Sequence, residues 1–300
     1  MSEIRDAGVV VRAGLARRPP PRAFSRLLRF VRQKPLGTAG AVILALTVAS
    51  AIFASQLAGY DPNAMSVDLL KAPSLGHPLG TDNLGRDILS RVLYGARTSL
   101  LVGFVATVMG TGTGALIGLT TAYWGRGWDL AAQRLMDMLW AFPTLIIAMV
   151  MMMVLGTSLR NVIIAISIVI LPTSARIVRS QVLKVKEMEY VTAAQALGAS
   201  GWRILFRHIA PNCMAPYIIV VSATLGGTIV TEASLSFLGL GVPPPTPSWG
   251  RDLFATGQTY SELAPWMPIA PGLALSFVVY GFNLLGDAIR DVLDPRLRGS

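Results

Sequence analysis

Few side chains in this sequence have the type and spacing that chemistry requires. The two histidines, His77 and His208, lie in polar segments, and the apolar stretches described below place these segments on opposite faces of a membrane. The two side chains therefore cannot share a metal ion, and no H-E-x-x-H motif occurs. No Ser/His/Asp set is evident, and the G-x-x-x-x-G-K-[ST] signature of nucleotide-binding loops is absent. We therefore expect no catalytic residue, no metal site and no nucleotide site in this chain.

Glycines and methionines form two further patterns, and each has a structural interpretation. Gly110, Gly114 and Gly118 recur at every fourth position, which is typical of closely packed membrane helices rather than of a phosphate-binding loop. The methionines at positions 149 and 151–153 point to different faces of a helix, so they cannot share one metal ion. We interpret them as adaptable apolar filler.

Glu232 is the one acidic residue that lies deep within an apolar stretch. A charge inside a membrane costs about 2.5–3.5 kcal/mol on insertion scales, so such a residue faces a cavity or a partner group. The sequence leaves two roles open for Glu232, a structural anchor near a helix end or a residue of a transport pathway.

The composition explains why so few polar groups are available. Of the 300 residues, 53% are hydrophobic and 14% are charged, whereas soluble domains carry about 25% charged residues. A disordered chain would be more polar, and a disulfide scaffold needs more than the single Cys213. The composition therefore predicts a membrane protein.

Six apolar stretches predict the spanning helices, each of which needs about 20 residues. They cover residues 36–57, 98–124, 138–159, 161–175, 212–231 (with further apolar residues to 240) and 263–286. The fourth stretch is short and carries Pro172 near its end. We expect an all-α, six-helix membrane domain over residues 36–290, between a basic tail at 1–35 and a second tail at 291–300.

The distribution of positive charge predicts the orientation. If the first tail is inside the cell, twenty of the 26 Lys and Arg residues lie on the inner side. Both termini are then cytoplasmic in a multi-pass protein of the lipid bilayer. The net charge of +10 is thereby explained without a nucleic-acid partner, and no basic stripe is interleaved with aromatic residues as base stacking would require.

One inner loop, at about residues 176–211, is long enough to form structure of its own. Its Ala-rich run at 192–197 favours a helix, and Gly198 suits the left-handed residue that ends one. Ser200 can cap a second helix, and Pro211 ends that helix or starts the next element. The loop therefore predicts a helix, a sharp turn and another helix.

Motifs in three segments carry a family resemblance. T-A-A-Q-A-L-G at 192–198, followed by I-A-P at 209–211, resembles the E-A-A-x-x-x-G…I-x-L-P loop of ABC importer permeases. H-P-L-G-T-D-N-L-G-R-D at 77–87, continuing to 100, and E-A-S-L-S-F-L-G-L-G at 232–241, with P-S-W-G at 247–250, look like the C-type permease subunit of dipeptide, oligopeptide and nickel importers. The resemblance covers nearly all of the chain after about residue 25.

The resemblance implies the type I ABC importer permease architecture, with the inner loop as a cytoplasmic coupling helix. It implies a B-type permease partner, two ABC ATPase subunits that bind ATP and Mg²⁺, and an extracytoplasmic substrate-binding protein, all at a bacterial cytoplasmic (inner) membrane. This chain needs no cofactor of its own. It would form half of a path for peptides, or alternatively for nickel or another small solute.

The resemblance and the residue patterns together indicate site residues. Those expected to couple to the ATPases are Thr192, Ala193, Ala194, Ala196, Leu197, Gly198, Arg203, Arg207 and Pro211. Those expected along the path or at an external gate are Glu232, Ser236 and Trp249. Thr192 departs from the family pattern, which usually has Glu there and so offers a carboxylate to the ATPase.

Other classes of membrane protein fit less well. A secondary carrier would need more buried ionisable groups than Glu232. A membrane enzyme would need a catalytic constellation, and a scaffold would not need an ordered helix-turn-helix loop.

Overall fold

The computed structural model describes residues 31–257, 260 and 262–293, and every named element within them is a helix. The expected tails at 1–35 and 291–300 lie mostly outside these residues. The helices, in order, are α2 (Pro35–Ile52), α3 (Ala54–Leu57), α4 (Ile88–Trp124), α5 (Arg126–Trp140), α6 (Thr144–Leu155), α7 (Leu159–Lys186), α8 (Glu189–Ala196), α9 (Gly201–Ile204), a π-helical turn (Leu205–Ile209), α10 (Ala210–Phe237), α11 (Trp249–Gly257) and α12 (Trp266–Leu293).

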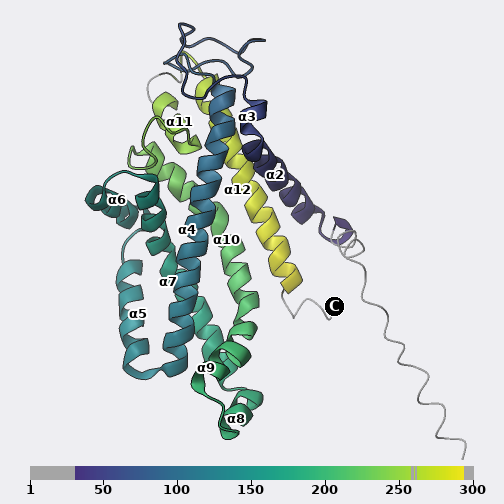
Figure 1. Ribbon diagram of the computed structural model, residues 1–300, viewed down its shortest axis with the longest axis vertical. Coiled ribbons are helices and arrows are strands. Elements are labelled where there is room, and N and C mark those ends of the chain that lie inside the picture. Colours follow the sequence, from purple (N-terminus) through teal and green to yellow (C-terminus); the bar gives the residue numbers. More distant parts are fainter. Residues whose placement is uncertain (1–30, 258–259, 261, 294–300) are drawn as a thin grey trace, which may run out of the picture.

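Long apolar helices form an elongated bundle (Figure 1). Five continuous helical segments are long and apolar enough to cross a membrane: α2, α4, α7, α12 and the run Gly201–Phe237 that ends with α10. Helices α5 and α6 make a sixth span if they are counted together, although they bend by 93° at the break between them. Helices α8 and α9 lie at one end of the bundle, and α3 and α11 lie towards the other (Figure 1).

The third expected span, a single helix at 138–159, is wrong. That segment contains the end of α5, the break before α6, and α6 itself. Pro143 stands at this break, where its ring disfavours a helical conformation in the residue before it. The spans were identified as stretches without charged residues. This criterion could not detect α5, because that helix carries Arg126, Asp129, Arg134 and Asp137.

The fourth expected span, at 161–175, is too short. Helix α7 continues beyond Pro172 and Arg176 to Lys186. The two arginines that seemed to end the span are paired with α5. Arg176 donates to Asp137 at 2.7 Å, and Arg179 forms two hydrogen bonds with Asp129 at 2.6 and 2.7 Å.

Among the helices that the structure describes, α4 and α7 share the most extensive contact. A Cβ at Gly110, Gly114 or Gly118 would collide with the backbone carbonyl oxygen of Ser167, Leu171 or Ala175, respectively. The glycine face thus lets the two backbones approach, as the small-residue pattern predicts. Because the backbones are close, side chains of one helix can form hydrogen bonds with the backbone of the other. The Ser174 hydroxyl, for example, donates to the Thr111 carbonyl at 2.7 Å.

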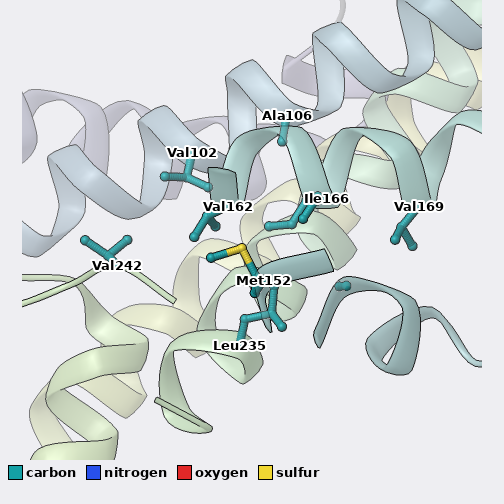
Figure 2. Close-up of a cluster of buried hydrophobic side chains, with 10 residues drawn as sticks. Val102, Ala106, Met152, Val162, Ile166, Val169, Leu235 and Val242 are labelled. Atoms are coloured by element: carbon teal, nitrogen blue, oxygen red, sulfur yellow. The ribbon is translucent and has the colours of Figure 1, made fainter. Parts of the chain in front are cut away.

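An apolar core beside this contact joins four helices and the segment after α10 (Figure 2). Its residues include Val102 and Ala106 of α4, Met152 of α6, Val162, Ile166 and Val169 of α7, Leu235 of α10, and Val242. Met152 is 1% exposed and lies among aliphatic side chains, so it acts as apolar filler.

The turn-rich segment before α4 folds back on the start of that helix. Asp87 caps α4 by accepting from the Ser90 backbone at 2.8 Å, and its other oxygen lies 2.9 Å from the ring of the buried His77. Asp82 likewise pairs with Arg86, at 2.6 Å. His77 is therefore a structural loop residue.

Helix α11 is attached to the same end of the bundle through a buried ion pair. Arg91 of α4 donates two hydrogen bonds to Asp252 of α11, one of them at 2.9 Å. Burial raises the pKa of the Asp252 carboxyl, and the charge of the Arg91 guanidinium opposes that shift. Because each charge is paired, the turn-rich segment before α4 and α11 form one unit with α4.

Candidate coupling site

The helix-turn-helix expected in the inner loop is present as α8, a turn at 197–200, and α9. Two hydrogen bonds define the turn: the Ala199 N–H donates to the Ala194 carbonyl at 3.1 Å, and the Gly198 N–H donates to the Gln195 carbonyl at 2.9 Å. This is the Schellman motif, which needs a left-handed residue, and Gly198 supplies it with a φ of +76°. Ser200 occupies the cap position of α9, but its side chain makes no capping hydrogen bond.

Buried side chains attach this element to the bundle. Val191 of α8 is 0% exposed and joins a core that contains Val182 and Val185 of α7, Ile204 of α9 and Leu205. The element is therefore packed on the end of the spanning helices and cannot swing as a free loop.

Polar and aromatic contacts reinforce the attachment. The Tyr190 hydroxyl accepts from Asn212 of α10 at 3.1 Å, and Lys186 donates to the Tyr123 carbonyl at the end of α4 at 2.7 Å. Trp202 of α9 packs edge-on against Trp124, with ring centroids 4.5 Å apart. Sequence reasoning missed these residues, because no local pattern links positions on five different helices.

The face of the element that points away from the bundle carries most of the assigned coupling residues. Leu197 stands at the turn and is 88% exposed. The other exposed members are Thr192, Ala193, Ala196, Gly198, Arg203, Arg207 and Pro211, and Ala194 is half-buried. The structure thus brings these residues together at one end of the molecule, where they present small and apolar side chains with two flanking arginines.

The residues assigned to the path or external gate occupy a different environment. Glu232, Ser236 and Trp249 are each at most 1% exposed within this single chain. The Glu232 carboxylate accepts from the Ser236 hydroxyl at 2.8 Å and from the Ser99 hydroxyl of α4 at 3.2 Å. The Trp249 indole donates to the Val92 carbonyl of α4 at 3.0 Å. These contacts join α10, α4 and α11, and none of the three side chains faces an open surface.

The enclosure of Glu232 leads to a testable expectation. Glu232→Ala should lower stability by about 2 kcal/mol or more, because it leaves a cavity and removes the acceptor of two buried hydroxyls. Glu232→Gln, which keeps the shape and one acceptor oxygen, should restore much of the loss. Thermal unfolding of the purified complex, measured beside transport, tests this. Normal stability with abolished transport in both variants would instead place Glu232 in the path.

The fold and the site together define a class. A bundle of membrane-spanning helices with a rigid, exposed helix-turn-helix at one end is the architecture of the permease subunit of an ABC transporter. The structure resembles the permease of the inward-facing MetNI methionine ABC transporter, with a TM-score of 0.55 and 18% identity over 68% of this chain and 96% of that one. At this identity the likeness shows the fold alone.

Sequence comparison shows the family. Residues 110–299 match the family described as "Binding-protein-dependent transport system inner membrane component", and the chain belongs to that family. A Brucella suis chain that carries the name of a peptide transport system permease protein is 44% identical over 86% of this chain and 87% of its own length. The glutathione transport system permease protein GsiD of Pectobacterium atrosepticum is 41% identical over 94% and 93%, and the dipeptide transport system permease protein DppC of Alkalihalophilus pseudofirmus is 41% identical over 92% and 90%.

Proposed function

We propose that this chain is one of two permease subunits of an ATP-driven importer that carries peptides across the inner membrane of a bacterium. The other components are a B-type permease, two ABC ATPases and an extracytoplasmic substrate-binding protein. The proposal places ATP and Mg²⁺ in the ATPases. This chain contributes half of the path and the contact through which ATPase motion reaches it.

The exposed face of α8 and its turn is the observation that supports this function most directly. Its small side chains leave the helix backbone accessible, and Leu197 projects from the turn as an apolar anchor. The opposite face is anchored in the core by Val191. A partner that moves α8 therefore also moves α7 and α10, because the helices are packed as a rigid body.

The proposed cycle follows from this rigid connection. ATP binding would close the two ATPases and bring the coupling elements of the two permeases together. The attached spanning helices would tilt and open the path to the other side of the membrane, which is an interface-driven rigid-body transition. The free energy comes from ATP, and the substrate-binding protein supplies the solute.

Peptides are the proposed solutes because the relatives are named for peptide, dipeptide and glutathione transport systems. These names do not favour the nickel alternative. The excess of Lys and Arg on one side of the predicted spans supports cytoplasmic termini. In that orientation α8 faces the cytoplasm, where ATP is available.

The decisive experiment is purification of the tagged chain from its native membrane, followed by mass spectrometry of the proteins that accompany it. We expect a second permease and one or two P-loop ATPases. The associated binding protein would then be tested for peptide binding. A chain that purifies alone and moves solute into liposomes without ATP would contradict the proposal and favour a secondary carrier.

Gly198 provides a test of the coupling mechanism. Gly198→Val should uncouple ATP hydrolysis from uptake, because a β-branched residue resists the left-handed conformation at +76°. No atom lies within 4 Å of a Cβ at this position, so the effect would come from backbone strain rather than a clash. Gly198→Asn is the matched control, since Asn tolerates that conformation. ATPase activity and peptide uptake are measured in the same proteoliposomes, and equal coupling in both variants would argue against the turn's role.

A further inference from the structure

A groove with a volume of about 820 Å³ lies between α7, α10 and α12. It follows α10 from Asn212 to Thr224, which corresponds to about 18 Å of helix. This volume is within the range that small-molecule sites occupy, about 300–1,000 Å³. The polar and charged residues that line it are Thr173, Gln181, Lys184, Asn212, Thr224 and Arg290.

The chemistry of this groove differs from that of a lipid-facing surface. The outward face of α4 is apolar, with Leu101, Phe104 and Val108 between 42% and 59% exposed. The groove instead presents hydroxyls among its apolar side chains, those of Thr173 and Thr224, away from the helix ends. Polar groups within a membrane usually face the interior of an assembly or a water-filled cavity. The groove is therefore better suited to a face that lies against a partner permease and solute than to one that lies against lipid.

Positive charge is concentrated at one end of the groove. Lys184 lies near the end of α7, next to α8, and Arg290 lies in the last turn of α12. Neither forms an ion pair with any residue that the structure describes, whereas Arg176 and Arg179 on the same α7 helix are both paired with aspartates. No Asp or Glu lines the groove. An anion that moved along the groove would meet two cationic groups at this end.

We infer that this groove forms the inner section of the translocation path in this chain, and that Lys184 and Arg290 receive the side-chain carboxylate of an acidic solute before its release. Guanidinium and ammonium groups both bind carboxylates through charge-assisted hydrogen bonds. The inference rests on the proposed peptide import and adds a preference for acidic peptides at the exit step. Basic residues at cytoplasmic helix ends also follow from membrane orientation alone, so the test must separate the two roles.

The first test compares an acidic with a basic dipeptide. Uptake of Ala-Glu and Ala-Lys is measured in proteoliposomes that contain the complete importer, at saturating binding protein, for the wild type and for a Lys184→Gln, Arg290→Gln double variant. The double variant should lower the ratio of acidic to basic uptake about twofold or more, since two solvent-exposed charge pairs with the solute are each weak but act together. Arg134→Gln is the control, because Arg134 is an exposed cation of α5 that does not line the groove.

The second test asks whether the groove contains water and solute. Cys213 is the only cysteine of the chain and is buried, so it provides a silent background. Thr224→Cys should react in inverted membrane vesicles with a charged, membrane-impermeant thiol reagent, and more slowly during peptide transport. Val108→Cys, on the apolar face of α4, should not react.

The outcomes separate this inference from the proposed function. If the wild type imports neither dipeptide, peptide import itself is contradicted. If it imports both, and the double variant leaves the ratio unchanged or lowers both rates equally, the carboxylate role is overturned. If Thr224→Cys is as unreactive as Val108→Cys, the groove does not line an aqueous path, and its cations serve orientation or lipid headgroups instead.

Discussion

The Leu197→Asp variant should lose most of its affinity for the ATPase subunits. Leu197 is 88% exposed at the turn after α8, and backbone hydrogen bonds rather than its side chain form that Schellman turn. The substitution should therefore leave the fold of this chain intact. A buried carboxylate in an apolar interface without a partner costs several kcal/mol, and an apolar anchor of an interface contributes about 2 kcal/mol or more. We therefore expect the dissociation constant to rise by about 30-fold or more.

Binding of purified ATPase to the detergent-solubilised permease pair measures this effect. Leu75→Asp is the matched control, because Leu75 is fully exposed in the loop before α4. That loop lies at the opposite end of the molecule from α8 (Figure 1). Both variants should keep the thermal unfolding midpoint of the wild type. Unchanged ATPase affinity in the Leu197 variant would mean that the docking surface lies elsewhere.

Gly114→Ala should destabilise the chain strongly although it adds one methyl group. The new Cβ would collide with the Leu171 carbonyl oxygen and would lie 3.1 Å from the Ala175 backbone nitrogen. Backbone atoms of a packed helix cannot rotate away as a side chain can, so α4 and α7 must separate. Overpacking of this kind costs about 1–3 kcal/mol or more. Gly114→Leu should leave no folded protein, as judged by size-exclusion chromatography in detergent.

Gly112→Ala is the control for this substitution. Gly112 lies on the same helix, and the nearest atom to its added Cβ would be the Tyr217 hydroxyl oxygen at 3.6 Å, an ordinary contact. Alanine also favours a helix over glycine by up to about 1 kcal/mol. The unfolding temperature should therefore stay or rise in Gly112→Ala and fall in Gly114→Ala. Similar midpoints in the two variants would show that the α4–α7 contact tolerates separation.

Much of the architecture could be predicted from sequence because its signals are local. Composition identified a membrane protein, since a polar shell needs charge that this chain lacks. The four-residue glycine repeat predicted a close helix contact, and Gly198 predicted the turn after α8. In each case the determining residues lie within one or two helical turns of one another.

The break in the third span has a local cause, Pro143, but the correct end of the fourth span depends on residues far apart in the chain. Arg176 and Arg179 do not end α7, because Asp137 and Asp129 of α5 neutralise them, and that pairing exists only once the two helices lie side by side. The same aspartates interrupt the apolar pattern of α5, so that helix was not predicted from hydropathy.

The sequence by itself therefore determined the class of the protein, most of its spanning helices and the shape of its exposed turn. Only the tertiary structure decided that Glu232 is enclosed by serines of α4 and α10, and that Lys184 and Arg290 meet at one groove. The physical reason is that a residue's helix propensity and hydropathy belong to its own segment. Its burial, its hydrogen-bond partners and the charge beside it come from segments that fold against it.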